Sequence, residues 1–148
     1  SMQDVLTELE QLKITASAKG FLKEIASWCK FLSILGFIGL GLLLLGSFFI
    51  GVLYNSLPLV AAVPFNLGTM MTIFYVVVVL IYIFPIYYLY QFSVKMKKAL
   101  LSKDDEVLAS AFEMLKSHYK FIGVFTIITV SVYLLVAISA LMGALGAV

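Results

Sequence analysis

Few side chains in this sequence are of a type that performs chemistry. His118 is the only histidine, Cys29 is the only cysteine, and no arginine is present among the 148 residues. A structural zinc site needs four ligands, usually including cysteine or histidine, and this pair cannot supply them. We therefore predict that the protein holds no metal and no cofactor and is not an enzyme. We interpret His118 as a hydrogen-bonding residue at the membrane interface.

The most suggestive polar feature is a group of four lysines with no acid among them: Lys95, Lys97, Lys98 and Lys103. They follow a long apolar run, and lysines in that position attract anionic lipid headgroups at about 1 kcal/mol per charge. We predict that these residues contact lipid headgroups. The alternative is that they only anchor the inner end of a span. The net charge of +2 is too small for a nucleic-acid-binding surface, so we expect no nucleic-acid partner.

The composition excludes a water-soluble fold. Hydrophobic residues make up 63% of the chain and charged residues 12%, whereas soluble domains average about 45–50% and about 25%. Lipid must therefore solvate much of the surface. We predict an all-α integral membrane protein that forms a single membrane domain, with three transmembrane helices and two cytoplasmic amphipathic helical segments.

Two long stretches without a charged side chain predict where the chain crosses the membrane. The first lies between Lys30 and Lys95, and the second runs from Phe121 to the end. Because a span needs about 20 apolar residues, the first stretch holds two spans and the second holds one. Prolines and asparagines in the middle of the first stretch predict the connection between its spans. The predicted elements are an amphipathic helix at 1–30, span one at 31–54, an outer loop at 55–67, span two at 68–92, a helical segment at 93–120 and span three at 121–146.

The lysines also predict the orientation. All ten lie within 1–30 and 95–120, and the loop 55–67 and the residues after span three contain none. Lysine near span ends marks the cytoplasmic side, so we predict a multi-pass protein of the inner (cytoplasmic) membrane with its N-terminus inside and its C-terminus outside. In the outer loop we expect a short turn of helix from Ser56 to Pro64, with a re-entrant piece as the alternative. No ionisable side chain lies inside a span, which argues against proton-coupled transport.

The second inner segment shows an amphipathic helical pattern. Ser102 and Asp105 have the spacing of a capping box at its start. The apolar stripe that follows at helical spacing consists of Leu108, Ala111, Phe112, Leu115 and Tyr119. An exposed apolar stripe must be covered, and the acids at its start would be repelled by anionic lipid. We therefore predict that the N-terminal helix packs on this stripe through Leu6, Leu9 and Leu12, within one chain or between chains.

Three positions inside the spans are candidates for helix packing or bending. Gly51 lies four residues after Ser47, and Gly143 lies four residues after Ser139. Small residues at this spacing let helix backbones approach closely, either within the chain or between chains. Because three spans enclose little volume, we predict a homo-oligomer with spans one or three at the interface. Pro85 removes a backbone hydrogen bond and predicts a kink in span two, for which a functional hinge is the alternative to a fixed bend.

Four short segments carry a family resemblance: WCKF at 28–31, FPIYYLY at 84–90, KMKKAL at 95–100 and LKSHYKFIG at 115–123. Between residues 15 and 135 the chain resembles a family of small bacterial multi-span membrane proteins known as a domain of unknown function. The resemblance implies a bacterial inner-membrane setting and a three-helix or similar core. It implies no activity, cofactor or site.

The sequence contains no set of residues that is typical of a catalytic site, so we expect a non-enzymatic function. We predict a small structural, scaffolding or regulatory membrane protein that acts through helix–helix and lipid contacts. One alternative is a passive channel or carrier formed by a homo-oligomer, which solute flux in liposomes would reveal. The other is an accessory subunit that docks an unidentified cytoplasmic protein, which co-purification would reveal.

Overall fold

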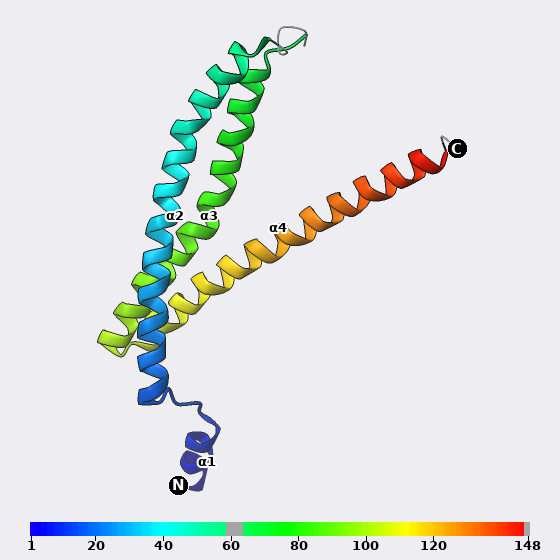
Figure 1. Cartoon of the computed structure of the whole chain (residues 1–148). Helices are drawn as coiled ribbons and strands as arrows, with labels where there is room; N and C mark the ends of the chain where they lie inside the picture. The colour runs from blue at the N-terminus through cyan, green and yellow to red at the C-terminus, as the bar shows by residue number, and fades with distance from the viewer. Residues whose placement is uncertain (59–63, 147–148) are drawn as a thin grey trace.

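Four helices make up the described part of the computed structural model, which covers residues 1–58 and 64–146, without the side chains of 7–10. They are α1 (Met2–Glu10), α2 (Ala16–Ser56), α3 (Leu67–Ser102) and α4 (Asp105–Gly146). This part of the chain is therefore all-α, and α2, α3 and α4 are each long and apolar enough to span a membrane. In Figure 1, α2 and α3 lie side by side as an antiparallel hairpin, and α4 diverges from it.

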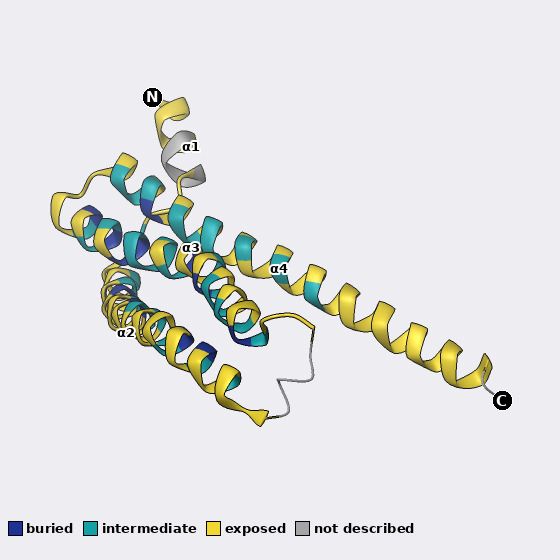
Figure 2. Cartoon of the chain, turned by 90° about the horizontal axis from the view of Figure 1, so that it is seen from above, coloured by how far each residue is buried: buried dark blue, intermediate teal, exposed yellow. Residues whose placement is uncertain are grey.

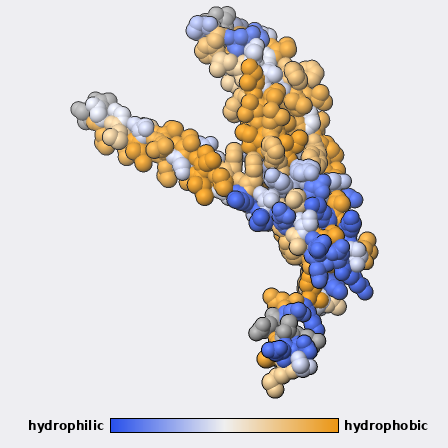
Figure 3. Space-filling model, turned by 180° about the vertical axis from the view of Figure 1, so that it is seen from behind, coloured by the Kyte–Doolittle hydropathy of each residue, from blue (hydrophilic) through white to orange (hydrophobic). Residues whose placement is uncertain are grey.

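Each of the three long helices exceeds the length of a membrane span. At 1.5 Å per residue they measure about 54 to 63 Å, against about 30 Å for the hydrocarbon core of a bilayer. The extra length carries the lysines. Figure 3 shows hydrophilic residues gathered where α2 begins and α3 ends, and we call this end of the hairpin the lysine-rich end. The helices α2, α3 and α4 thus continue past the predicted ends of the spans without a break at the membrane boundary.

The predicted helix over 1–30 is divided in two by the structure. Residues 11–15 are not helical, and Thr15 caps α2 by accepting a hydrogen bond from the Ala18 amide at 3.2 Å. A hydroxyl at this position satisfies an amide that has no partner within the helix. From Ala16 onward the helix runs without a break into the predicted span one, so the second half of the predicted segment is the start of α2.

A two-residue connection joins α3 to α4. Lys103 has a left-handed backbone, with φ 54°, and its N–H donates to the Ala99 carbonyl, which ends α3. Asp104 caps α4, because its carboxylate accepts a hydrogen bond from the Glu106 amide at 2.9 Å. The prediction that Ser102 caps this helix is wrong, since Ser102 is the last residue of α3. A carboxylate at the start of α4 also interacts favourably with the helix dipole.

Small residues bring α2 and α3 together at the end of the hairpin opposite the lysine-rich end. A Cβ atom on Gly51 would overlap the Thr72 hydroxyl, and one on Gly68 would overlap the Gly51 carbonyl. The Thr72 hydroxyl lies 3.1 Å from the Ser47 carbonyl oxygen and donates to it across the two helices. The Asn55 side-chain oxygen accepts from the Gly68 amide at 3.2 Å. The close approach predicted for Gly51 is thus found within the chain, where this glycine faces α3.

The main buried cluster lies at the lysine-rich end, where three helices meet. Phe92 and Met96 of α3 are fully buried, together with Ala26 of α2 and Ala111 of α4. The small alanines on the flanking helices leave room for the two large side chains of α3. The side chains that pack around them are Leu22, Cys29, Leu100, Leu108, Met114 and Leu115. This junction holds the base of α4 against the hairpin, as the buried residues in Figure 2 show.

The junction covers three of the five residues of the apolar stripe predicted on α4. Ala111 is buried, and Leu108 and Leu115 pack against the cluster, whereas Phe112 and Tyr119 are exposed. Among the described helices the packed pairs are α2 with α3 and α3 with α4, and Figure 1 shows α1 apart from α4. Leu6 and Leu12, through which the N-terminal helix was predicted to pack, are exposed, and the side chain of Leu9 lies outside the described residues. The described residues therefore do not make the predicted packing within a single chain. The reason is that α3 runs past its predicted end and covers the stripe itself.

The second half of α4 has no such cover. Every residue from Ser131 to Gly146 is exposed, and Figure 2 shows this half of α4 standing away from the hairpin. No atom lies within 4 Å of a Cβ atom built on Gly143. The packing predicted for Gly143 is therefore not made within the chain.

The turn of helix predicted from Ser56 to Pro64 falls largely on residues 59–63, which lie outside the described residues. Ser56 is the last residue of α2, and its hydroxyl donates to the Leu53 carbonyl at 2.7 Å. On the far side of the connection, the Asn66 side chain caps α3 by accepting a first-turn amide at 3.0 Å.

Candidate functional site

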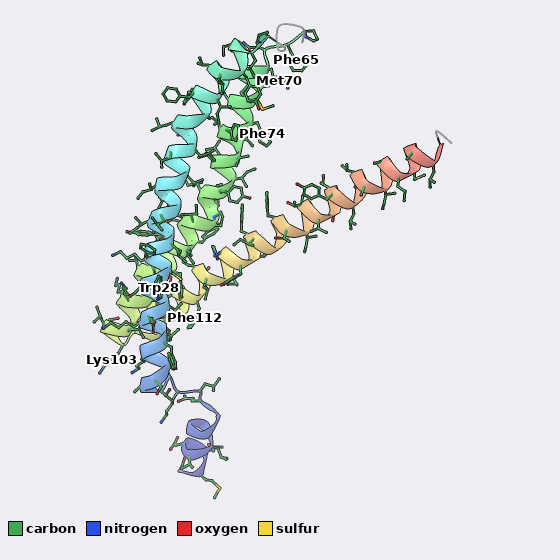
Figure 4. All side chains as sticks on the ribbon, viewed as in Figure 1. Trp28, Phe65, Met70, Phe74, Lys103 and Phe112 are labelled. Atoms are coloured by element: carbon green, nitrogen blue, oxygen red, sulfur yellow. The ribbon has the colours of Figure 1, made fainter. Side chains whose placement is uncertain are left out.

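The lysine-rich end is the part of the chain where polar side chains of different helices approach one another. Figure 4 shows Trp28 and Phe112 at this end, with Lys103 at the turn between α3 and α4. Trp28 and Phe112 are both exposed, at 59% and 42%. Exposed aromatic side chains beside lysines are typical of the interface between a membrane and water.

The four predicted headgroup lysines do not form one group in the structure. Lys95 points towards α4, where its ammonium group donates to the Ser110 hydroxyl at 2.8 Å. Lys97 lines a hollow between α2 and α3, Lys98 is exposed, and Lys103 occupies the turn after α3. Because a helix completes a turn in about 3.6 residues, Lys95 and Lys97 point to opposite sides of α3, and Lys103 lies beyond the end of the helix. Lys95 therefore connects two helices of the protein.

The hollow beside Lys97 brings together lysines that the predicted headgroup cluster did not include. We call it the α2–α3 hollow, and its volume is about 380 Å³. It is lined by Lys19, Gly20, Lys23 and Ser27 of α2 and by Lys97, Leu100 and Leu101 of α3. The spacing of four between Lys19 and Lys23 indicates that they share a face of one helix. That this face lies opposite Lys97 could not be read from the sequence, because it depends on how α2 and α3 pack.

A second hollow, of about 460 Å³, lies on the other side of Lys19, between the start of α2 and the α3–α4 turn. Lys13, Lys19 and Lys103 line it, together with Asp104 and Asp105. The acids balance much of the positive charge, so this hollow is less suited to an anion than the α2–α3 hollow.

A hydrogen bond connects α4 to the proline of α3. The His118 Nδ1 atom lies 2.7 Å from the Pro85 carbonyl oxygen. A carbonyl oxygen only accepts, so Nδ1 carries the hydrogen and donates. This contact agrees with the hydrogen-bonding role predicted for His118. Pro85 lies inside α3, which continues through it, and the kink predicted at Pro85 stays a prediction.

The other reactive residues do not assemble into a site. Among the described residues no group of three or more His, Cys, Asp or Glu side chains is placed to hold a metal ion. Cys29 is half-buried and packs against the cluster around Phe92. The ion pair found in the described part joins the Ser1 amino group to Asp4 at 3.1 Å. The Ser1 hydroxyl and this amino group hold the pKa of the Asp4 carboxyl below its ordinary value.

Three features of the structure could take part in function: the lysine-lined hollow, the junction of three helices and the exposed half of α4. No protein-family model, no curated protein and no solved structure matches this chain, so the family resemblance stays a prediction from the sequence.

Proposed function

We propose that this chain is a small non-enzymatic membrane protein that acts through helix–helix and lipid contacts and assembles with copies of itself along α4. The observation that carries the proposal is a contrast within α4. Around Ala111 the helix packs on α3 as part of the buried cluster at the junction, whereas every residue from Ser131 to Gly146 is exposed.

Exposure alone does not imply a protein partner, because lipid solvates an apolar helix. The course of α4 supplies the further argument, since it diverges from the hairpin and leaves a wedge between them (Figure 1). Transmembrane helices tilt by about 20° from the membrane normal on average. Two helices of one chain that diverge as strongly as α4 and the hairpin cannot both keep this average tilt. A helix of a second copy in the wedge would add van der Waals contacts, and the small residues Ser139 and Gly143 permit a close approach.

The proposal includes an orientation and a membrane. The lysine-rich end lies in the cytoplasm, the connection between α2 and α3 lies outside, and the setting is the inner membrane of a bacterium. The support for the orientation is the charge distribution, since all ten lysines lie in segments 1–30 and 95–120.

Cysteine cross-linking in native membranes tests the assembly. In a Cys29→Ser background, Gly143→Cys should give covalent dimers with a bifunctional maleimide. Leu53→Cys is the matched control, because both positions lie three residues before the end of an apolar helix and both are exposed. We expect strong cross-linking through Gly143→Cys and little through Leu53→Cys.

Two results would contradict the proposal. One is a monomer by light scattering in several mild detergents together with no cross-link in membranes. The other is solute flux in liposomes that increases with the amount of protein, which would favour a channel formed by several copies.

A further inference from the structure

The α2–α3 hollow is lined by positive charge that no carboxylate in its lining balances. Three of its seven lining residues are lysines, Lys19, Lys23 and Lys97, and no carboxylate is among them. These lysines also form no ion pair with any described side chain. Three ammonium groups that line one hollow repel one another, and an anion placed between them offsets this repulsion. The hollow therefore favours an anion.

The shape of the hollow comes from residues without bulk on the α2 side. No atom lies within 4 Å of a Cβ atom built on Gly20, so the backbone of α2 is open between Lys19 and Lys23. The Ser27 hydroxyl donates to the Lys23 carbonyl at 3.0 Å and stays close to its own helix. A ligand group can thus approach α2 between the lysines.

The α3 side of the hollow is apolar. Leu100 is half-buried and packs against the junction cluster, and Leu101 is 86% exposed. An exposed leucine beside converging lysines suits a ligand that has both a charged group and a hydrocarbon part. A free inorganic anion would gain nothing from Leu101.

The hollow lies beside the predicted membrane boundary. Lys97 is three residues beyond Val94, the last residue of the charge-free run, which corresponds to about 4.5 Å along the helix. Ser27 lies four residues before Phe31, or about 6 Å. The headgroup layer is about 5 to 8 Å thick on each side, so the inner edge of the hollow lies at headgroup depth. Lys19 and Lys23 extend from there towards the water.

We propose that the α2–α3 hollow binds the phosphate of an anionic phospholipid, with Lys19, Lys23 and Lys97 around the phosphate and Leu101 against the start of an acyl chain. This inference rests on the lipid contacts of the proposed function and names their site. It differs from the headgroup cluster predicted from the sequence, since only Lys97 belongs to both. The lipid thereby bridges α2 and α3 at the end where α4 is attached.

Lipid retention in native mass spectrometry tests the proposal. Detergent-purified protein is titrated with dioleoylphosphatidylglycerol and, in parallel, with dioleoylphosphatidylcholine. The test variant carries Lys19→Gln, Lys23→Gln and Lys97→Gln. The control carries Lys30→Gln, Lys116→Gln and Lys120→Gln, which removes the same charge from exposed positions outside both hollows. Each lysine is worth about a factor of five near an anionic headgroup, so the test variant should lose about a hundredfold in affinity for phosphatidylglycerol.

A second variant keeps all ten lysines, so a folding defect caused by the loss of charge cannot explain its result. Gly20→Leu fills the hollow and improves the helix propensity of α2, so its loss of lipid cannot come from a weakened helix. Gly39→Leu is its control, because a side chain there also meets open space and Gly39 is not among the residues that line the hollow. We expect Gly20→Leu to weaken phosphatidylglycerol binding and Gly39→Leu to leave it unchanged.

Three outcomes would overturn the site. Equal losses in the test and control lysine variants would show a diffuse effect of charge. Equal retention of phosphatidylcholine and phosphatidylglycerol by the natural sequence would show no anion preference. Displacement of bound phosphatidylglycerol by inorganic phosphate at constant ionic strength, lost in the test variant, would assign the hollow to a free anion. Cross-linking through Gly143→Cys is repeated in the test variant. If the lipid site is wrong but the assembly is right, the cross-link still forms; if the assembly is wrong, it is absent in both the natural sequence and the test variant.

Discussion

His118 of α4 donates a hydrogen bond from Nδ1 to the carbonyl oxygen of Pro85 in α3, across 2.7 Å. The contact lies seven residues, or about two helix turns, from Ala111 on α4 and from Phe92 on α3, towards the apolar halves of both helices. The bond from Lys95 to Ser110 lies within the cluster, since Lys95 stands between Phe92 and Met96 on α3 and Ser110 precedes Ala111 on α4. The attachment of α4 to α3 continues past His118, where the rings of Tyr82 and Phe125 lie 5.9 Å apart.

Replacing His118 with alanine should loosen this attachment. We expect a loss of about 0.5–1.5 kcal/mol in the free energy of unfolding, the usual worth of one hydrogen bond. His118→Asn, whose amide can donate from a similar position, should restore part of the loss. Unfolding in mixed micelles gives the energy, and amide hydrogen exchange in 113–123 gives the location. Identical exchange in His118→Ala and the natural sequence would show that the bond contributes nothing.

Two glycines of α2 should respond to alanine in opposite directions. At Gly51 a Cβ atom would overlap the Thr72 hydroxyl, so Gly51→Ala should destabilise the hairpin by about 1–3 kcal/mol, as overpacking does. At Gly41 the space is open, so Gly41→Ala should be neutral or stabilise by up to about 1 kcal/mol through helix propensity. Denaturation of both variants in the same detergent measures the difference. A Gly51→Ala variant as stable as Gly41→Ala would rule out the close contact with α3.

The start of α4 should depend on Asp104 and not on Ser102. The Asp104 carboxylate accepts the Glu106 amide at 2.9 Å, and loss of such a cap costs about 0.5–2 kcal/mol. Asp104→Ala should therefore destabilise the first turn of α4, and Asp104→Asn should retain most of the stability. Ser102→Ala, at the end of α3, should change little. Hydrogen exchange of residues 105–108 reports on the cap, and equal rates in the two alanine variants would contradict this assignment.

Deleting residues 1–10 should leave the base of α4 unchanged. Within the chain Leu108, Ala111 and Leu115 of the stripe pack in the cluster around Phe92 and Met96, and α1 does not pack extensively on α4. We expect equal hydrogen exchange in 105–120 for the full and shortened chains. Faster exchange in the shortened chain would mean that α1 of another copy covers the stripe.

The orientation can be tested with single cysteines in whole cells. In a Cys29→Ser background, an impermeant maleimide should label Ser56→Cys, at the end of α2 opposite the lysine-rich end, and should not label Ser102→Cys in intact cells. Ser102→Cys should react once the membrane is opened. The reverse pattern would place the lysine-rich end outside.

The sequence by itself was enough to predict an all-α protein with three long apolar helices, because helix class and span length depend on composition and on the runs between charged residues. It also placed Ser47 and Gly51 among the candidates for close packing, since small residues at a spacing of four can be read directly. The ends of the helices were harder to predict, as Ser102 and Asp104 show. Capping depends on which of two neighbouring polar residues leaves the helix, and that choice is made by a local turn of one or two residues.

Only the tertiary structure decided which faces meet. The apolar stripe on α4 fitted either the N-terminal helix or the end of α3, and the outcome depended on α3 continuing to Ser102 and carrying Phe92 and Met96 to the junction. The same holds for Lys19, Lys23 and Lys97, which are far apart in the chain and line one hollow. A helical pattern gives the angular position of a side chain about its own axis, but the rotation and offset of two packed helices are set by the fit of both surfaces.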